Sequence, residues 1–180
     1  MAELSAPTEH VRQSFLDAMA EFRAEGRGSA DDHTMIGGEI RRFGESWSSG
    51  PDAFRGYVEW LRAQSLEETP RPENFVPCTS LWWVDGTEYL GRVAIRHRLT
   101  DSLREFGGHI GYDVRSSARR RGHATGMLRA ALPVARSLGI DRALLTCDAG
   151  NTASRKVIEH NGGQLEDQRG ATLRFWIPIR

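Results

Sequence analysis

Hydrophobic residues recur at helical spacing in two stretches of the N-terminal part of the chain. The first stretch, APTEHVRQSFLDAMAEFRAEG, opens with a Thr-Glu start signal and closes on a glycine, whereas the second, GPDAFRGYVEWLRAQSL, opens on Pro51-Asp52. The positions that share a face of these two predicted helices are Val11, Phe15, Met19 and Phe22, and then Phe54, Tyr57, Val58 and Leu61. The polar segment RGSADDHTMIGG between them is interpreted as a loop.

The pattern changes to that of β-strands after the breaker-rich segment EETPRPEN. The stretches VPCTSLWWV and YLGRVAIRHRL flank a tight turn at Asp85-Gly86, which predicts a hairpin, and GGHIGYDV predicts a further strand. A helix from Gly122 to Leu138, interrupted only by Pro133, then precedes the strand RALLTCD. A last helix, from Thr152 to His160, is followed by two short strands in GQLEDQ and TLRFWIPI.

The order of these elements predicts an α/β fold. N-terminal helices come before a meander of strands, and strands and helices alternate after it, as expected for a mixed central β-sheet flanked by helices. A chain of 180 residues is large enough to bury a core and is expected to form one domain over residues 1–180.

The composition is that of an ordinary globular protein without net charge. Hydrophobic residues make up 39% of the chain and charged residues 27%, and the formal net charge is +0. A neutral balance argues against general nucleic-acid binding, and no apolar run approaches membrane length. Cys78 and Cys147 lie far apart and lack the spacing of metal ligands, so we expect free thiols, no bound metal and a cytoplasmic location.

The stretch VRSSARRRGHATGML joins a predicted strand to a predicted helix. A helix that opens at Gly122 presents unsatisfied main-chain N–H groups and partial positive charge, both of which favour phosphate groups. Gly122 and the small Ala124 allow close approach to the main chain, and arginine side chains bind phosphate through charge-assisted hydrogen bonds. The alternative is that Arg119 to Arg121 are solvent-exposed side chains of a turn and bind no ligand.

This stretch resembles the acetyl-CoA signature of the GNAT superfamily of N-acetyltransferases. That signature is a strand followed by Gln/Arg-x-x-Gly-x-Gly/Ala at the start of a helix. Arg119, Gly122 and Ala124 stand in its three places, and Val114 stands five residues ahead of Arg119.

A second signature of the superfamily follows in the expected order. NTASRKVIEHNGG resembles its Asn-x-x-Ser/Ala helix, with Asn151 and Ser154 in the matching places. The resemblance covers residues 76–180, which we expect to be the cofactor-binding core, and residues 1–75 fit the variable N-terminal helices of the family. Within the superfamily the chain is similar to a group of bacterial predicted acetyltransferases, a resemblance that leaves a homodimer open.

The resemblance implies that acetyl-CoA is the co-substrate. Main-chain groups of Tyr112 to Val114 would pair with the pantetheine arm as an added strand does, and the Val114 amide would point at the thioester carbonyl. Amides from Arg120 to Thr125 would hold the pyrophosphate, and the two residues of the second signature would contact the rest of the cofactor. The implied cofactor set is Tyr112, Asp113, Val114, Arg119, Arg120, Arg121, Gly122, His123, Ala124, Thr125, Asn151 and Ser154.

The chain departs from the family at two catalytic positions. Ile158 stands where many members have a tyrosine acid, and Thr146 stands where some have a glutamate base. The candidates that remain are His109, Glu105 and His97, because histidine has an unperturbed pKa near ~6.5 and glutamate accepts protons readily. A structural histidine on the other strand face, or a solvated loop carboxylate, is the alternative for each of them.

The acceptor side is expected near the end of the first helix. Glu21, Glu25, Asp31 and Asp32 cluster there, and they would favour a cationic amine if they line the cleft. The sequence therefore predicts an enzyme that transfers an acetyl group to the amine of a small molecule. Acetylation of protein N-termini or lysines, and a non-catalytic acyl-CoA-binding module, remain as alternatives.

Overall fold

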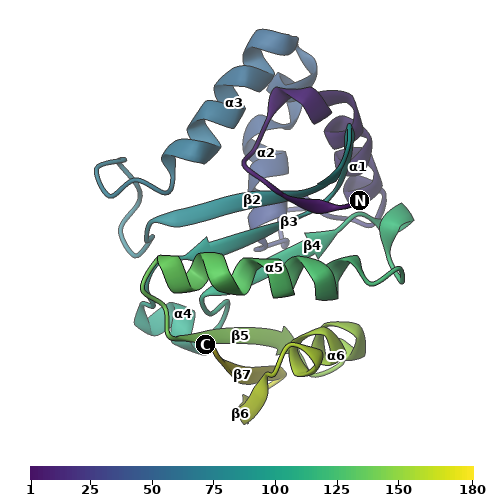
Figure 1. The fold of residues 1–180 in the computed structure, drawn as a ribbon. Coiled ribbons are helices and arrows are strands. Elements are labelled where there is room, and N and C mark those ends of the chain that lie inside the picture. Colours follow the sequence, from purple (N-terminus) through teal and green to yellow (C-terminus); the bar gives the residue numbers. More distant parts are fainter.

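The strands form two antiparallel sheets whose neighbouring edges meet at β4 and β5. The computed structural model describes residues 1–180 and is drawn as a ribbon in Figure 1. One sheet has the strand order β1-β2-β3-β4 and the other the order β5-β7-β6. In chain order the elements are β1 (Glu3–Ser5), η1 (Glu9–Val11), α1 (Arg12–Ala24), α2 (Met35–Ser48), α3 (Pro51–Ala63), β2 (Cys78–Asp85), β3 (Glu88–Arg96), α4 (Asp101–Glu105), β4 (Ile110–Val114), η2 (Ser116–Ala118), α5 (His123–Ser137), β5 (Arg142–Asp148), α6 (Thr152–His160), β6 (Gln164–Arg169) and β7 (Thr172–Pro178).

The strands β4 and β5 are joined at one end only. The His109 N–H donates to the Leu144 carbonyl at 2.7 Å, and no ladder pairs the two strands beyond that point. Their arrows point the same way in Figure 1, and α5 links the end of β4 to the start of β5. One main-chain edge of β4 is therefore left without a strand partner.

Two hydrophobic cores lie on opposite faces of the four-stranded sheet. β3 contributes Tyr89 to one core and Leu90, Val93 and Ile95 to the other. A one-residue shift in its pairing with β2, between Tyr89 and Gly91, places Tyr89 on the face opposite Val93. The helices α1, α2 and α3 cover the first face and α5 covers the second (Figure 1). The N-terminal helices therefore share a core with β2 and β3.

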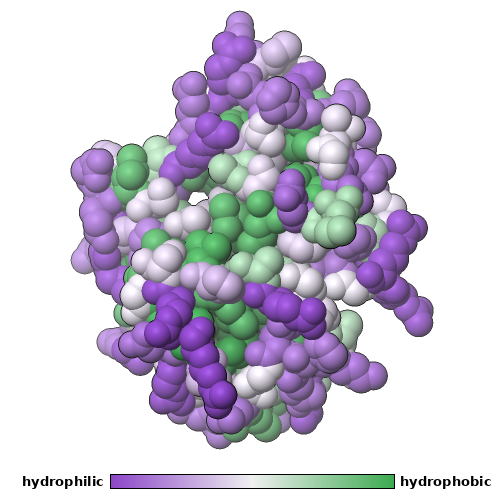
Figure 2. Space-filling view, viewed as in Figure 1, coloured by the Kyte–Doolittle hydropathy of each residue, from purple (hydrophilic) through white to green (hydrophobic).

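The surface is mostly polar, with one apolar region on the side that carries α5. Figure 2 shows hydrophobic residues as a band across the middle of this face. None of the helices combines the length and the hydrophobicity that a membrane span requires. No three metal-ligating side chains are gathered in the structure.

The structure confirms the predicted α/β class and most of the predicted elements. α1 and α3 lie within the two predicted N-terminal helices, and β2 and β3 form the hairpin, with Gly86 at φ 59° in its turn. β4, α5, β5, α6, β6 and β7 follow in the predicted order, and α5 continues through Pro133 as one helix. The short elements β1 and α4 are not predicted, because three and five residues carry too little periodicity.

The prediction of a loop is wrong at its C-terminal end, because α2 begins at Met35 and continues to Ser48. The glycines of α2 have low helix propensity, so the sequence pattern of this segment does not predict a helix. In the structure they are contact points: a Cβ on Gly37 would lie 2.1 Å from the Asp32 carboxylate, and one on Gly44 would lie 2.1 Å from the Arg23 guanidinium. The same glycines that weaken the helical pattern therefore let the Asp32 and Arg23 side chains lie directly against α2.

A buried ion pair joins α2 to the sheet. The Arg92 guanidinium donates to both carboxylate oxygens of Glu39, at 2.7 and 3.1 Å, and the Tyr57 hydroxyl donates to the same carboxylate at 2.6 Å. The side chains of Arg92 and Glu39 are 3% and 8% exposed, so neither charge is solvated if the other is removed. Three elements, α2, α3 and β3, thus meet at one carboxylate.

We expect Glu39→Gln to destabilise the fold far more than Tyr57→Phe. The first change leaves the Arg92 charge buried without a counter-charge, which costs about 3 kcal/mol or more, whereas the second removes one hydrogen bond worth about 1 kcal/mol. Chemical denaturation of both variants measures the difference in the free energy of unfolding. Equal losses would mean that the ion pair is not what holds α2 on the sheet.

Candidate active site

Most of the predicted cofactor residues line one cavity of about 600 Å³. The cavity lies between β4, the loop after it, the first turns of α5 and α6, and the segment that joins α1 to α2. Arg121 is exposed and does not line the cavity, so the structure gives no support to its predicted contact with the cofactor. The predicted residues that do line it are Tyr112, Asp113, Val114, Arg119, Arg120, Gly122, His123, Ala124, Thr125, Asn151 and Ser154.

The N-terminus of α5 presents free main-chain donors to the cavity. Gly122 precedes the helix at φ 80°, and Arg120, two residues earlier, also has a positive φ of 63°. No side chain caps the helix, and the hydrogen bond from Gly126 N–H to the Gly122 carbonyl, at 3.0 Å, marks its first turn. The amides of residues 123–125 therefore have no acceptor within the helix, which is the arrangement that binds phosphate groups.

The free edge of β4 borders the same cavity. Arg115 N–H donates to the Leu90 carbonyl at 3.0 Å, and hydrogen-bonded pairs recur every second residue of an antiparallel ladder. By this alternation the main chain of Asp113 faces β3, whereas the main-chain groups of Tyr112 and Val114 face away from it. An extended ligand can therefore pair with Tyr112 and Val114 as an additional strand would.

The first turn of α6 closes the cavity on the other side. The Asn151 Oδ1 caps the helix by accepting from the Ser154 N–H at 3.0 Å. The hydroxyls of Ser154 and Tyr112 are hydrogen-bonded at 2.7 Å, which links β4 to α6 across the open edge. Burial raises the pKa of Tyr112 to about 12, so its hydroxyl stays protonated at neutral pH.

Three arginines tie the end of α1 and the segment after it to β4 and its loop. Arg119 donates through Nε to the Val114 carbonyl at 2.9 Å and pairs with Glu25. Arg27 donates through two nitrogens to one carboxylate oxygen of Asp113, both at 3.1 Å. The sequence does not predict that Arg27 lines the cavity, because a contact over 86 residues leaves no local signal.

The third arginine holds the base of the loop. Arg115 donates through Nε to Glu21 at 2.9 Å, and the Ser117 N–H donates to the same carboxylate at 3.0 Å. Burial alone would raise the pKa of Glu21, but these hydrogen bonds and those from the Ser116 and Ser117 hydroxyls lower it to about 2. The carboxylate is therefore ionised throughout the physiological range and fixes α1 against η2.

The three predicted catalytic side chains do not reach the cavity. His109 is buried with its Nδ1 accepting from the Leu144 N–H at 2.9 Å, and burial, together with nearby arginines, lowers its pKa to about 4. Glu105 pairs with Arg169 at the surface. His97 is hydrogen-bonded at 2.8 Å to the Thr79 hydroxyl. Each of the three side chains has a structural contact, and none of them lines the cavity.

The two positions at which the chain departs from its family are also structural. Ile158 is fully buried in the core that α5 covers. The Thr146 hydroxyl accepts a hydrogen bond from the Gly107 N–H at 2.9 Å and so holds the turn before β4. Positions 158 and 146 therefore supply neither an acid nor a base to the site.

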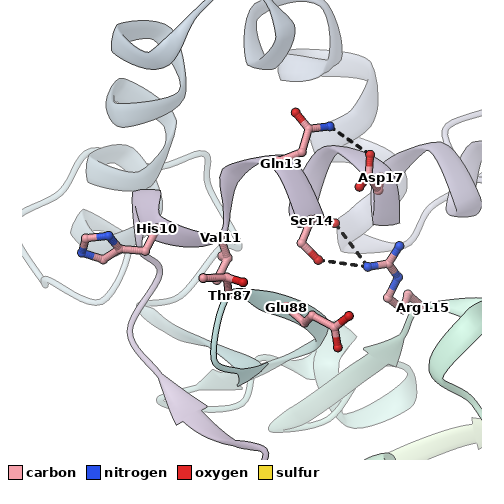
Figure 3. A pocket seen from close by; sticks show the side chains of 8 residues that line it. All are labelled: His10, Val11, Gln13, Ser14, Asp17, Thr87, Glu88 and Arg115. Atoms are coloured by element: carbon pink, nitrogen blue, oxygen red, sulfur yellow. Dashed lines mark hydrogen bonds between the residues drawn. The ribbon is translucent and has the colours of Figure 1, made fainter.

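A second hollow, of about 370 Å³, lies at the start of α1 and is separate from the predicted set. Figure 3 shows it between α1 and the turn after β2, with Arg115 donating to the hydroxyl and the carbonyl of Ser14. Its Arg115 is already bound to Ser14 and Glu21, and its lining is almost wholly polar. Its contacts hold α1 against the start of the loop that follows β4.

The open edge of β4 and the uncapped helix beside it define a site for an extended, anionic cofactor. Residues 29–164 match the model of the acetyltransferase (GNAT) domain family. The match covers well over half of the chain, and the protein belongs to this family. It is accordingly an acyl-CoA-dependent N-acetyltransferase whose co-substrate is acetyl-CoA.

Solved structures of acetyltransferases share the fold over nearly the whole chain. The PaiA N-acetyltransferase of Thermoplasma acidophilum, in complex with coenzyme A, has a TM-score of 0.60 and 13% identity, over 99% of each chain. RimJ of Mycobacterium smegmatis, with CoA-disulfide, has a TM-score of 0.66 and 18% identity, over 98% of this chain and 81% of that one. The ribosomal-protein-S5-alanine acetyltransferase of Vibrio fischeri has a TM-score of 0.65 and 11% identity, over 99% and 93%. No match is found among the curated proteins.

We expect Gly122→Asp to weaken coenzyme A binding by at least about tenfold, because it sets a negative charge beside the phosphate-binding amides. Gly139→Asp is the matched control: both glycines have positive φ, 80° and 84°, and open space where a Cβ would lie, but Gly139 follows the far end of α5. Both variants should lose about 1 kcal/mol of stability to backbone strain. Calorimetric titration with coenzyme A should separate them, and equal affinities would move the phosphate site elsewhere.

We expect His109 to make the fold less stable in acid. Its pKa is about 4 in the folded protein against 6.5 for the free side chain, so the unfolded chain binds the extra proton between those values. Stability therefore falls as the pH drops through this window, by at most about 1.4 kcal/mol per pH unit. His109→Gln should flatten the slope between pH 6.5 and 4.5 in thermal or denaturant unfolding. The exposed His10→Gln is the control, and parallel slopes in both variants would contradict the expectation.

Proposed function

We propose that this protein transfers the acetyl group of acetyl-CoA to the amine of a small molecule by direct attack within a ternary complex. The observation that carries the proposal is that one cavity gathers the unpartnered amides before α5, the free edge of β4 and the capped start of α6. Acetyl-CoA, when bound, supplies the activated thioester. The amides of residues 123–125 would hold its pyrophosphate, and Tyr112 and Val114 its pantetheine arm.

The Val114 N–H is the group we assign to stabilising developing negative charge. It faces away from β3, and its own carbonyl is held by Arg119 at 2.9 Å, so the direction of the peptide is fixed. A fixed donor stabilises an oxyanion without reorganising during the reaction. The histidine and carboxylates that line the cavity already have partners: His123 Nδ1 accepts from the Trp83 indole N–H at 3.2 Å, and Glu25 and Asp113 are paired with Arg119 and Arg27. We therefore propose that the proton of the acceptor amine leaves through water.

The segment between α1 and α2 supports a small acceptor. The Arg27–Asp113 and Arg119–Glu25 pairs hold it at the edge of a cavity of about 600 Å³, a volume that suits small molecules. A second candidate is the α-amine of a protein N-terminus, because several acetyltransferases with this fold are named for ribosomal proteins.

The two free cysteines support a cytoplasmic location, and the apolar band in Figure 2 supports a homodimer.

We expect the folded protein to bind coenzyme A and to release it from acetyl-CoA when a suitable amine is present. Calorimetry with coenzyme A tests the first step, and a thiol-release assay across small amines and peptides with free N-termini tests the second. Turnover of peptides alone would favour the second candidate. Absence of heat on addition of coenzyme A to well-folded protein would overturn the proposal.

A further inference from the structure

We propose that Trp83 positions the His123 imidazole so that this side chain donates a neutral hydrogen bond, through Nε2, to a phosphate of the cofactor. This inference rests on the proposed function, which places the diphosphate at the start of α5, and adds a positioning residue on β2. His123 is the first residue of α5 and lines the cavity beside the amides assigned to the diphosphate. Trp83 does not line the cavity and acts only through His123.

The Trp83 side chain reaches α5 from the middle of the four-stranded sheet. Trp83 is the strand partner of Leu4 in β1 and of Gly91 in β3, and it is 8% exposed. Its ring lies against the first turn of α5, where a Cβ on Gly126 would be 3.4 Å from the indole. The indole N–H donates to His123 Nδ1 at 3.2 Å. Packing against both the sheet and the helix therefore fixes the direction of this donor.

The chemistry of the two rings decides where the imidazole proton lies. An indole N–H can only donate, so His123 Nδ1 must carry a lone pair when it accepts from Trp83. The proton of the neutral ring is then on Nε2, because the partner of one ring nitrogen sets the state of the other. A proton on Nδ1 would oppose two N–H groups and leave the indole donor without an acceptor, which costs free energy. Trp83 therefore stabilises the neutral ring with its proton on Nε2.

The Nε2–H group is available to a ligand. The only hydrogen bond of the His123 ring is the one through Nδ1, and the side chain is half-buried at the cavity wall. The ionised oxygens of a diphosphate accept hydrogen bonds, so the Nε2 donor would add to the main-chain amides of residues 123–125. In the same state the ring has no unused lone pair, so His123 binds the cofactor and does not take a proton from the acceptor.

The charges around His123 agree with a neutral ring. The charged side chains that line the cavity with it are Glu25, Arg27, Asp113, Arg119 and Arg120. Four of them form the Arg119–Glu25 and Arg27–Asp113 pairs, whereas Arg120 pairs with no carboxylate, so a further positive charge would be repelled. The first turn of α5 and the cavity-lining residues of α6 carry no charge, and Asp85 on β2 is paired with the N-terminal ammonium group.

The test measures coenzyme A affinity by calorimetry near neutral pH and in mild acid, for the wild-type protein, Trp83→Phe, His123→Ala and the double variant. His123→Ala should weaken binding about tenfold, because it removes a hydrogen bond to a charged group. It also records the titration of the ligand itself, against which the other proteins are compared.

We expect the affinity of Trp83→Phe to rise about fivefold from about pH 8 to about pH 6 relative to His123→Ala, because the released imidazole can be protonated and an imidazolium binds phosphate more strongly. The wild-type protein should gain less than about twofold over the same range, because Trp83 keeps the ring neutral. The gain should vanish in the double variant. Trp82→Phe is the matched control, since it is the same change at the next residue of β2 and its indole N–H has no acceptor in the protein, and it should keep the wild-type profile.

The pH profile separates positioning from packing. If Trp83 only filled the core, Trp83→Phe would change the affinity equally at both pH values and equally with or without His123, and the inference would be overturned. Two-bond 1H–15N NMR spectra of the wild-type protein, with His123 assigned by its loss in His123→Ala, should show a lone pair on Nδ1 and a proton on Nε2. The opposite tautomer would overturn the inference even if Trp83→Phe did not fold. Failure of the wild-type protein to bind coenzyme A at all would instead overturn the proposed function, so calorimetry and NMR distinguish the two failures.

Discussion

The separation of β4 from β5 is the constraint on which the site depends. A strand inside a sheet uses its main-chain groups on both sides, but β4 pairs with β3 alone, and a single main-chain hydrogen bond joins His109 to Leu144 before the two sheets diverge. Tyr112 and Val114 thereby keep free donors and acceptors at the edge of an otherwise paired sheet. The buried His109 and the turn held by Thr146 stabilise the point of divergence.

Ion pairs hold the other parts of the site next to the free edge of β4. Glu21, Glu25 and Asp32 lie at the end of α1 or just after it, and their partners Arg115, Arg119 and Arg27 bring the loop after β4 and Asp113 into contact with that segment. The Arg115–Glu21 and Arg27–Asp32 pairs are partly buried, so solvent screens them less than it screens surface ion pairs such as Arg119–Glu25. The loop after β4 and the segment after α1 consequently share one set of fixed charges.

The sequence predicts most residues that line the cavity from β4, α5 and α6, but not those from the segment after α1, for a physical reason. The phosphate-binding turn and the start of α6 are local motifs, in which spacing alone places Gly122, Asn151 and Ser154 at helix ends. The contact between Arg27 and Asp113 spans 86 residues and has no such spacing. His109 has the residue type expected of a base, but only the structure shows that its Nδ1 is occupied by a main-chain N–H and faces away from the cavity.

The glycines of α2 have a consequence for how this acceptor segment can change. Asp32 fits against the start of α2 only because Gly37 has no side chain, and Asp32 in turn positions Arg27. A transplant of residues 26–34 into another acetyltransferase would thus carry its geometry only together with the glycine of the following helix and the aspartate of the strand. We therefore expect residues 26–34, Gly37 and Asp113 to be substituted together when related enzymes diverge in the substrates they accept.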